Sequence, residues 1–313
     1  MDLPKTCQFL NEAQSRGLRM VLVTVCGVEG SSMRNPGTIM GVAEDGSFAG
    51  SLSGGCIENA VVAEAIDVLT NGAPRVVRFG AGSSYLDIRL PCGGGLDLSF
   101  HVIEDTSFVQ SCLASIEART PFSIETGPGG PRHVPNWHQA VFDPEGGEAI
   151  FGHYPGPDLQ IIGHGGGVEA LATMAAAFGC TARILTPDER LIQQLRPRGF
   201  AAHLLERTNQ TDLLQSDPWT ATVFLFHDHD WEIDLIEQAL TMPHFYLGAM
   251  GGRRAHAFRN EALSKRGVSQ DQLDTIRAPI GLFHSSRDPH TLALSTLGEV
   301  IRSYEETSWA PDV

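Results

Sequence analysis

The sequence predicts an α/β protein in which a small N-terminal α/β domain precedes a Rossmann-like, doubly wound parallel sheet. From residue 158 onward, short apolar runs alternate with helical patterns, an order that is typical of βαβ units. The first 105 residues contain several short apolar runs and few helical patterns, and residues 121–157 are rich in glycine and proline. We therefore expect an N-terminal domain at 1–118, a connector of strands and loops at 119–157, a Rossmann-like domain at 158–306 and a tail at 307–313.

The N-terminal domain is expected to begin with an amphipathic helix at 3–16, which Gly17 ends. Buried strands should follow at 19–26 and 38–43, and a third strand should lead into a turn at 51–56. After this turn, one face of a predicted helix carries the apolar residues Ile57, Val61, Ala65, Val68 and Leu69. The remaining elements are strands at 73–79, 86–90 and 96–103 and a helix at 107–118.

The C-terminal half alternates regularly between strand and helix. Strands are expected at 159–162, 181–186, 201–205, 222–226 and 245–250. Helices are expected from 167 to Gly179 and at 189–195, 231–240, 254–265 and 289–304. Between the two halves, the block Thr-Gly-Pro-Gly-Gly-Pro at 126–131 is expected to lie outside any helix or inner strand.

Composition excludes several classes of protein. The net charge of −15 over 313 residues argues against non-specific binding to nucleic acid or to an anionic membrane surface. No apolar run approaches the ~20 residues of a membrane span, and the N-terminus lacks the order of a signal peptide. Six cysteines in a chain of this size, without a Cys-x-x-Cys pair, do not indicate a disulfide scaffold. We therefore expect a cytoplasmic protein with reduced thiols.

Two cysteines lie beside consecutive glycines. Cys56 ends the turn Ser-Leu-Ser-Gly-Gly-Cys at 51–56, and Cys92 lies in Pro-Cys-Gly-Gly-Gly at 91–95. Glycines before a helix leave backbone N–H groups for a phosphate, and the helix dipole lowers the pKa of a thiol placed there. The alternative is that both cysteines are buried residues at tight bends. Under the functional interpretation, we expect both sulfurs to face one hollow that opens toward the Rossmann-like half.

The segment Gly-His-Gly-Gly-Gly-Val at 163–168 follows a predicted strand and precedes a predicted helix, as a dinucleotide-binding loop does. However, Val168 occupies the place of the third glycine, where we expect it to hinder close helix–strand packing. Thr186 replaces the acidic residue that usually binds the ribose, with Asp188 two residues further on. Contact of this loop with a phosphate or a pterin is therefore favoured over binding of NAD(P).

Two further segments lie where parallel strands should end. His-Asp-His-Asp at 227–230 could bind a metal, but Asp230 is equally suited to cap the following helix. Gly-Gly-Arg-Arg at 251–254 could hold an anion through Arg253, or its arginines could be solvated on a first helical turn. Nucleophilic Ser/His/Asp catalysis lacks the Gly-x-Ser-x-Gly motif that would support it.

Together these motifs resemble the xanthine dehydrogenase accessory factors, the XdhC/CoxI family of proteins that serve maturation of the molybdenum cofactor. In the N-terminal half the similarity is carried by Val-Thr at 23–24, Gly-Ser-Ser at 30–32, Pro-Gly at 36–37, Gly-Ser-Leu-Ser-Gly-Gly-Cys-Ile-Glu at 50–58 and Pro-Cys-Gly-Gly-Gly-Leu-Asp-Leu at 91–98. In the C-terminal half it is carried by residues 162–165, 227–230, 234, 246–251, 253–254 and 278–282. The resemblance covers nearly the whole chain and is weakest at 107–157.

The resemblance implies a chaperone that binds the molybdenum cofactor, in its molybdopterin or dinucleotide form, and supports its sulfuration and insertion into a molybdenum hydroxylase apoenzyme. It also implies cooperation with a cysteine desulfurase, and we expect a homodimer because the N-terminal sheet has edge strands. Cys56 and Cys92 are the first candidates for contact with sulfur or with the molybdenum of the cofactor. The full set of candidate cofactor contacts is Ser53, Gly54, Gly55, Cys56, Glu58, Cys92, Gly93, Gly94, Gly163, Gly165, Gly166 and Arg253.

The chain departs from the usual family pattern at 163–168, at 185–188 and at 283–286, all near the expected C-terminal ligand site. We therefore expect the C-terminal site to take a different ligand or to bind weakly, whereas both cysteine motifs are intact. Two alternatives remain open: an NAD(P)-dependent oxidoreductase that uses the Rossmann-like half, and a non-catalytic scaffold for a hydroxylase and a desulfurase. We favour a maturation chaperone over an enzyme with turnover of its own.

Overall fold

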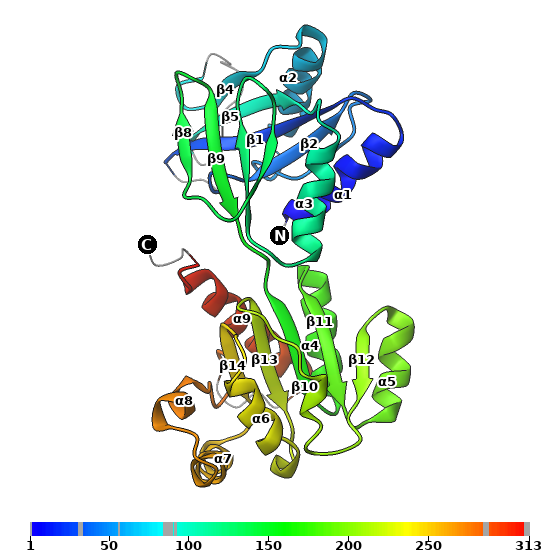
Figure 1. Ribbon diagram of the computed structural model, residues 1–313, viewed down its shortest axis with the longest axis vertical. Helices are drawn as coiled ribbons and strands as arrows, with labels where there is room; N and C mark the ends of the chain where they lie inside the picture. Colours follow the sequence, from blue (N-terminus) through cyan, green and yellow to red (C-terminus); the bar gives the residue numbers. More distant parts are fainter. Residues whose placement is uncertain are drawn as a thin grey trace. The chain divides into compact units, whose positions relative to one another are not determined.

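The computed structural model describes residues 2–30, 34–55, 57–83, 90, 93–283 and 288–309 (Figure 1). Within them the chain forms two compact units: the described part of Met1–Pro155 together with Trp309, and Gly156–Ser308. Cys56, Cys92 and most of the strand expected at 86–90 lie outside the described residues. The predicted α/β class, with a Rossmann-like second half, is confirmed. No helix in the described ranges is long and apolar enough to cross a membrane.

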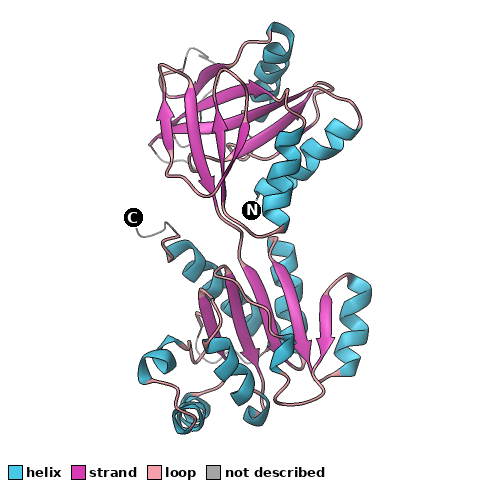
Figure 2. Ribbon diagram, in the orientation of Figure 1, coloured by secondary structure: helices cyan, strands magenta, loops and turns pink. Residues whose placement is uncertain are grey.

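A five-stranded antiparallel sheet forms the centre of the first unit, in the order β3-β2-β1-β5-β4 (Figure 2). Its strands are β1 (Met20–Glu29), β2 (Ile39–Ala43), β3 (Phe48–Ala49), β4 (Arg75–Gly80) and β5 (Gly95–Val102). Successive side chains of a strand point to opposite faces, so Val21 and Val23 belong to one core while Leu22 belongs to another. Both faces of this sheet are therefore covered.

Three helices cover the two faces of this sheet: α1 (Asp2–Ser15), α2 (Glu58–Asn71) and α3 (Ser107–Glu117). The face of α2 predicted to be apolar is buried against the sheet, and Gly72 ends the helix in a left-handed conformation with φ of 72°. On the opposite face, Leu10 of α1 and Cys112 of α3 share a core with Leu22. The turn before α2 is thus attached to a well-packed helix.

The segment expected to be a connector contains a second sheet, in the order β7-β6-β9-β8. Its strands are β6 (Phe122–Thr126), β7 (Arg132–Pro135), β8 (Val141–Asp143) and β9 (Glu148–His153). The Gly/Pro-rich block lies outside the strands from Gly127 onward, in a turn that the Gly130 N–H closes on Gly127 O at 2.9 Å, but its first residue, Thr126, ends the inner strand β6, which the sequence did not predict. Cys26 of β1 packs against Ala149 and Phe151 of β9, so this sheet belongs to the first unit.

A five-stranded parallel sheet in the order β12-β11-β10-β13-β14 forms the second unit. Its strands are β10 (Asp158–Gly163), β11 (Thr181–Thr186), β12 (Ala201–Leu204), β13 (Thr220–Leu225) and β14 (Tyr246–Ala249). Helices α4 (Gly166–Phe178), α5 (Glu189–Leu195) and α9 (Pro289–Glu306) cover one face, and α6 (Ile233–Leu240), α7 (Arg253–Lys265) and α8 (Gln270–Thr275) cover the other. In sequence order this is 3-2-1-4-5, the order of the first five strands of a doubly wound dinucleotide-binding fold.

Three local features differ from the sequence-based expectation. Val168 is fully buried in the core beneath α4, so the fold accommodates the side chain that was expected to hinder packing. A 3-10 turn at His229–Trp231 precedes α6, which begins at Ile233 and not at residue 231. Helix α8 was not predicted, because its capping box at Ser269 is followed by only one buried apolar residue.

Candidate functional site

The turn that precedes Cys56 is organised by Glu58, the first residue of α2. The Glu58 side chain is almost fully buried, with the residue 6% exposed. Its carboxylate accepts hydrogen bonds from the hydroxyls of Ser51 (3.2 Å) and Ser53 (2.8 Å). It also accepts the backbone N–H groups of Leu52 (3.1 Å), Ser53 (3.0 Å) and Ile57 (3.2 Å). One side chain therefore holds the turn on both sides of position 56.

These hydrogen bonds set the ionisation of Glu58. Burial alone raises its pKa, but hydrogen bonds from Ser53, from the Gly55 N–H and from its own N–H outweigh burial and lower the pKa to about 2. Glu58 is therefore a carboxylate at neutral pH. It contributes a negative charge to the turn, where a phosphate was expected to bind.

The backbone donors of the turn point mostly inward. The Gly54 N–H donates to Ser51 Oγ at 3.2 Å, and the Ile57 N–H is shared between Ser53 Oγ and Glu58. Gly54 and Gly55 have φ values of 78° and 108°, a left-handed conformation that favours glycine. The glycines are thus explained by the path of the chain, and contact of Ser53, Gly54, Gly55 and Glu58 with a cofactor stays a prediction.

Around the second cysteine loop, the structure describes the strand ends that enter and leave it. Gly93 N–H donates to Leu90 O, and Ala81 N–H donates to Gly94 O, both at 2.9 Å. A Cβ atom on Gly80 would lie 2.3 Å from Gly94 O, so the two strands approach as closely as glycine allows. Each glycine is held by one backbone hydrogen bond, and contact of Gly93 and Gly94 with a cofactor stays a prediction.

Arg78, which sequence analysis did not single out, ties these strand ends together. Its guanidinium bonds Asp97 of β5 through Nη1 at 3.0 Å and the carbonyl of Ala81 through Nε at 2.7 Å. It also pairs with Glu29 at the end of β1. These partners lie in β5, directly after β4 and in β1. Arg78 therefore fixes the strand ends on either side of the second cysteine loop.

In the second unit, the predicted glycine loop lies at the carboxyl edge of the parallel sheet, where open α/β sheets bind ligands. Gly165 is the N-cap of α4, with φ of 81° and no side-chain capping bond. Gly165 and Gly166 are exposed, and Gly163 ends β10. The first turn of α4 therefore presents backbone N–H groups that suit a phosphate.

Histidines from two neighbouring strands meet at this edge. His164 follows β10 and His227 follows β13, and their rings stack with centroids 5.8 Å apart. His229 lies two residues further on, and its Nδ1 is 2.8 Å from Glu232 Oε1. His164 was not predicted as a site residue, although its place between two glycines of the loop was visible in the sequence. The edge thus combines amide donors with flat aromatic rings.

A buried ion pair supports His229. Glu232 and Arg259 are both 0% exposed, and Arg259 bonds Glu232 Oε1 through Nε (3.0 Å) and Nη2 (2.8 Å). Burial raises the pKa of Glu232, and the charge of Arg259 opposes this shift. Arg259 also donates to the carbonyl of Met250, just beyond β14. In the sequence, the spacing of three residues between His229 and Glu232 indicates that these two side chains can meet, but nothing indicates the pairing with Arg259.

Other predicted roles at this edge have the following outcomes. The cap of the 3-10 turn is Asp228, whose Oδ1 accepts the Asp230 N–H at 3.1 Å, so the expectation that Asp230 is the cap was wrong. The turn begins at His229, two residues before the helix start expected at residue 231. Arg253 is exposed in the first turn of α7, and anion binding by it stays a prediction. Among the described residues, no group of three His, Cys, Asp or Glu side chains could hold a metal ion.

At the end of β11, the position whose carboxylate recognises ribose in dinucleotide-binding folds is occupied by Thr186. Thr186 is fully buried, and its hydroxyl accepts the Asp188 N–H at 3.1 Å. The Asp188 carboxylate caps α5 by accepting the N–H groups of Arg190 (2.9 Å) and Leu191 (3.3 Å). Oδ1 of Asp188 is therefore engaged in capping α5, and the expectation that NAD(P) is disfavoured stays a prediction.

Fold and site together define a class: a two-unit α/β protein with a glutamate-anchored turn in one unit and a glycine loop at a Rossmann-type sheet edge in the other. The sequence model described as the XdhC Rossmann domain matches residues 159–300, and the model of the XdhC and CoxI family matches residues 13–80. The chain belongs to the XdhC and CoxI family, which confirms the resemblance noted from its motifs.

Several known proteins are similar to this chain. The molybdenum cofactor insertion chaperone PaoD of Escherichia coli (strain K12) is 34% identical over 303 residues, which cover 96% of this chain and 88% of PaoD. A Bacillus subtilis (strain 168) protein, named as a probable component of xanthine dehydrogenase, is 25% identical over 324 residues, with 90% and 92% of the two chains covered. A crystal structure from Bacillus halodurans, described as a xanthine dehydrogenase, has a TM-score of 0.78 at 19% identity, covers 98% of each chain and supports the fold.

Proposed function

We propose that this protein is a chaperone that carries the molybdenum cofactor as cargo, supports its sulfuration and inserts it into a molybdenum hydroxylase of the xanthine dehydrogenase type. The observation that carries the proposal is the 34% identity, over 96% of the chain, with the molybdenum cofactor insertion chaperone PaoD. The match to the XdhC and CoxI family supports it. The cargo is transferred unchanged in its pterin part, so no turnover chemistry is required of the chain.

In this proposal, Cys56 supplies a thiolate for the cargo's molybdenum or accepts the sulfur that a cysteine desulfurase delivers, and Cys92 is the second thiol. Thiolates suit a soft metal–sulfur centre. Glu58 acts as a positioning residue, because its five hydrogen bonds hold the turn on both sides of position 56. A turn that is already ordered loses little conformational entropy when it binds.

The proposal assigns phosphate binding in the second unit to the start of α4. There the exposed Gly165 and Gly166 lack a side-chain cap, so their N–H groups are the better donors for an anion. In the first unit, by contrast, the amides of Leu52, Ser53 and Gly54 already donate within the turn. Hydrolysis of the bound cargo distinguishes its two forms, because the dinucleotide form releases a nucleotide and the molybdopterin form does not.

Cargo binding is tested by producing the full chain in a host that makes molybdopterin and measuring pterin fluorescence after oxidation of the purified protein. We expect the wild type to carry pterin and Cys56→Ala and Cys92→Ala to lose most of it. Cys180→Ala is the matched control, because Cys180 is a buried thiol in the core of the second unit. Equal pterin in all four proteins removes the cysteines from the mechanism, and absence of pterin from the wild type overturns the proposal.

Two measurements separate the proposal from its alternatives. Activation of a hydroxylase apoenzyme should fail with the Cys56→Ala/Cys92→Ala protein; activation that survives, together with an intact complex, would identify a scaffold. Titration with NADH and NADPH, followed by fluorescence, should show no saturable binding, whereas tight binding would favour an oxidoreductase.

The homodimer is also part of the proposal, and sedimentation velocity of the purified chain tests it.

A further inference from the structure

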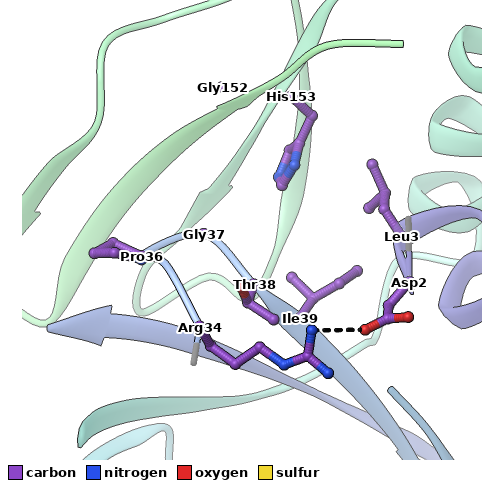
Figure 3. Close-up of a pocket in the computed structure, with 9 residues that line it drawn as sticks. All are labelled: Asp2, Leu3, Arg34, Pro36, Gly37, Thr38, Ile39, Gly152 and His153. Carbon is purple, nitrogen blue, oxygen red and sulfur yellow. Dashed lines mark ion pairs between the residues drawn. The ribbon is translucent and has the colours of Figure 1, made fainter. Parts of the chain in front are cut away.

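A cavity of about 220 Å³ in the first unit has no role in the proposal above. It is lined by the first turn of α1, by the segment of residues 34–39 that leads into β2, and by the end of β9 (Figure 3). At ~30 Å³ per water molecule, its volume corresponds to about seven waters, the space of a small metabolite. The Pro-Gly pair at 36–37, which carries part of the family resemblance, forms one wall.

The wall formed by residues 34–39 is held in place by backbone contacts. The Gly37 N–H donates to Val25 O at 2.8 Å, and the Val25 N–H donates to Thr38 O at 2.9 Å. Gly37 has a φ of 90°, and a Cβ atom there would lie 3.0 Å from Cβ of Phe151. The segment is thus fixed between β1 and β9, so the cavity does not depend on a ligand to form.

One cation and one anion lie together in the lining. Arg34 Nη1 is 3.2 Å from Asp2 Oδ2, and the two side chains are 31% and 41% exposed. Asp2 begins α1, where the helix dipole favours a negative charge. The Arg34–Asp2 pair is close to neutral overall, and because it is partly exposed it can exchange partners at little cost.

His153 supplies an unused polar atom. Its side chain points from the end of β9 toward the 34–39 segment (Figure 3), and its ring packs against Phe122 with centroids 5.5 Å apart. Nε2 is buried and has no hydrogen-bond partner in the part of the chain that is described. Burial lowers the pKa of His153 to about 4, so the imidazole is neutral at pH 7 and offers one hydrogen bond.

We propose that this cavity binds a small zwitterion of amino-acid size, whose carboxylate is held by Arg34 and His153 Nε2 and whose ammonium is held by Asp2. A simple anion would bring a like charge next to Asp2, and a simple cation would do the same next to Arg34. A molecule with both charges offers an opposite charge to each of the two residues. Leu3 and Ile39 offer an apolar wall for a short aliphatic side chain.

The proposal does not rest on cofactor binding and is tested separately, by calorimetric titration of the full chain at pH 7 with L-valine and its two single-charge analogues. These are 3-methylbutanoate, which lacks the ammonium, and 2-methylpropan-1-amine, which lacks the carboxylate. We expect L-valine to bind and each analogue to bind about tenfold more weakly or worse, because one charge-assisted contact is lost. No binding of L-valine overturns the proposal, as does binding of 3-methylbutanoate with equal affinity.

Three variants locate the binding. Arg34→Gln and His153→Ala should each weaken L-valine binding about tenfold or more. Asp2→Asn should also weaken L-valine binding, but it should strengthen binding of 3-methylbutanoate, because the like charge next to the carboxylate is removed. Arg132→Gln is the matched control, since Arg132 is an exposed arginine of the same unit paired with Glu125. Asp2 and Arg34 are partly exposed, so these two variants should keep the wild-type thermal transition. Affinity unchanged in all three variants would place the binding elsewhere and overturn the proposal.

Discussion

The two units each contain a buried glutamate at the start of a helical segment, and the two are held in different ways. Glu58 is surrounded by neutral donors from its own turn, all within seven residues along the chain. Glu232 is bound by Arg259, 27 residues away on another helix, and by His229. Their pKa values are shifted in opposite directions, downward to about 2 for Glu58 and upward for Glu232.

The opposite pKa shifts indicate that the neutral donors around Glu58 favour its charged form more than Arg259 and His229 favour that of Glu232. Both oxygens of Glu58 accept hydrogen bonds. Glu232 Oε2 and Arg259 Nη1 are buried and have no partner among the residues that the structure describes. An ion pair that leaves polar atoms unsatisfied recovers only part of the free energy lost on leaving water.

The largest expected effect comes from breaking the ion pair. Arg259→Ala leaves the Glu232 charge buried, and we expect a loss of about 3–5 kcal/mol in the free energy of unfolding of the second unit. Urea unfolding of the full chain, followed by probes for each unit, measures it. Arg266→Ala is the control, because its pairs with Asp234 and Glu237 are at the surface and should contribute less than ~1 kcal/mol. Similar losses for both arginines would contradict the comparison.

Acidification should act on Glu58 in the first unit. Its folded pKa of about 2 lies below the ordinary value of 4.5, so its contribution is complete above about pH 4.5 and is lost as the pH falls toward 2. At ~1.4 kcal/mol per pKa unit, the difference between 4.5 and about 2 corresponds to a full contribution of about 3.5 kcal/mol. The difference in unfolding free energy between wild type and Glu58→Gln should therefore shrink between pH 5 and pH 2. A difference that does not change over this range would show that the hydrogen bonds do not favour the charged form.

The smallest effect should follow from His229→Ala. Glu232 loses the hydrogen bond from His229 but keeps Arg259 on the same oxygen, so we expect a loss of about 1 kcal/mol in the second unit. The same chemical denaturation experiment measures it. A loss as large as that of Arg259→Ala would mean that the histidine, and not the arginine, stabilises the buried charge.

Much of the fold could be predicted because its elements carry local signals. The apolar face of α2 and the alternation of strands and helices after residue 158 are periodic in the sequence. Strands β6–β9 were described only as part of a connector, because short strands between glycines and prolines have little periodicity. The Arg78 clamp and the Arg259–Glu232 pair join residues far apart in the chain, so no local pattern reveals them.

The candidate site was predictable to a smaller extent. The glycine loop at the sheet edge follows from a strand, a glycine run and a helix in order, and the structure places it there. Glu58 was named from the sequence, but as a contact for the cofactor, since the sequence does not show that Ser51, Ser53 and three amides turn toward it. Which way a polar group points depends on backbone dihedral angles that sequence patterns do not give.

Because every described partner of Glu58 lies within seven residues of it, the turn closes over a very short stretch of chain. Short loops lose little entropy on closure, and helix α2 supplies the adjoining scaffold. Because the apolar face of α2 packs against β1 and β5, the turn and the helix can acquire their shape during synthesis once β5 has been made, before the parallel sheet of the second unit exists.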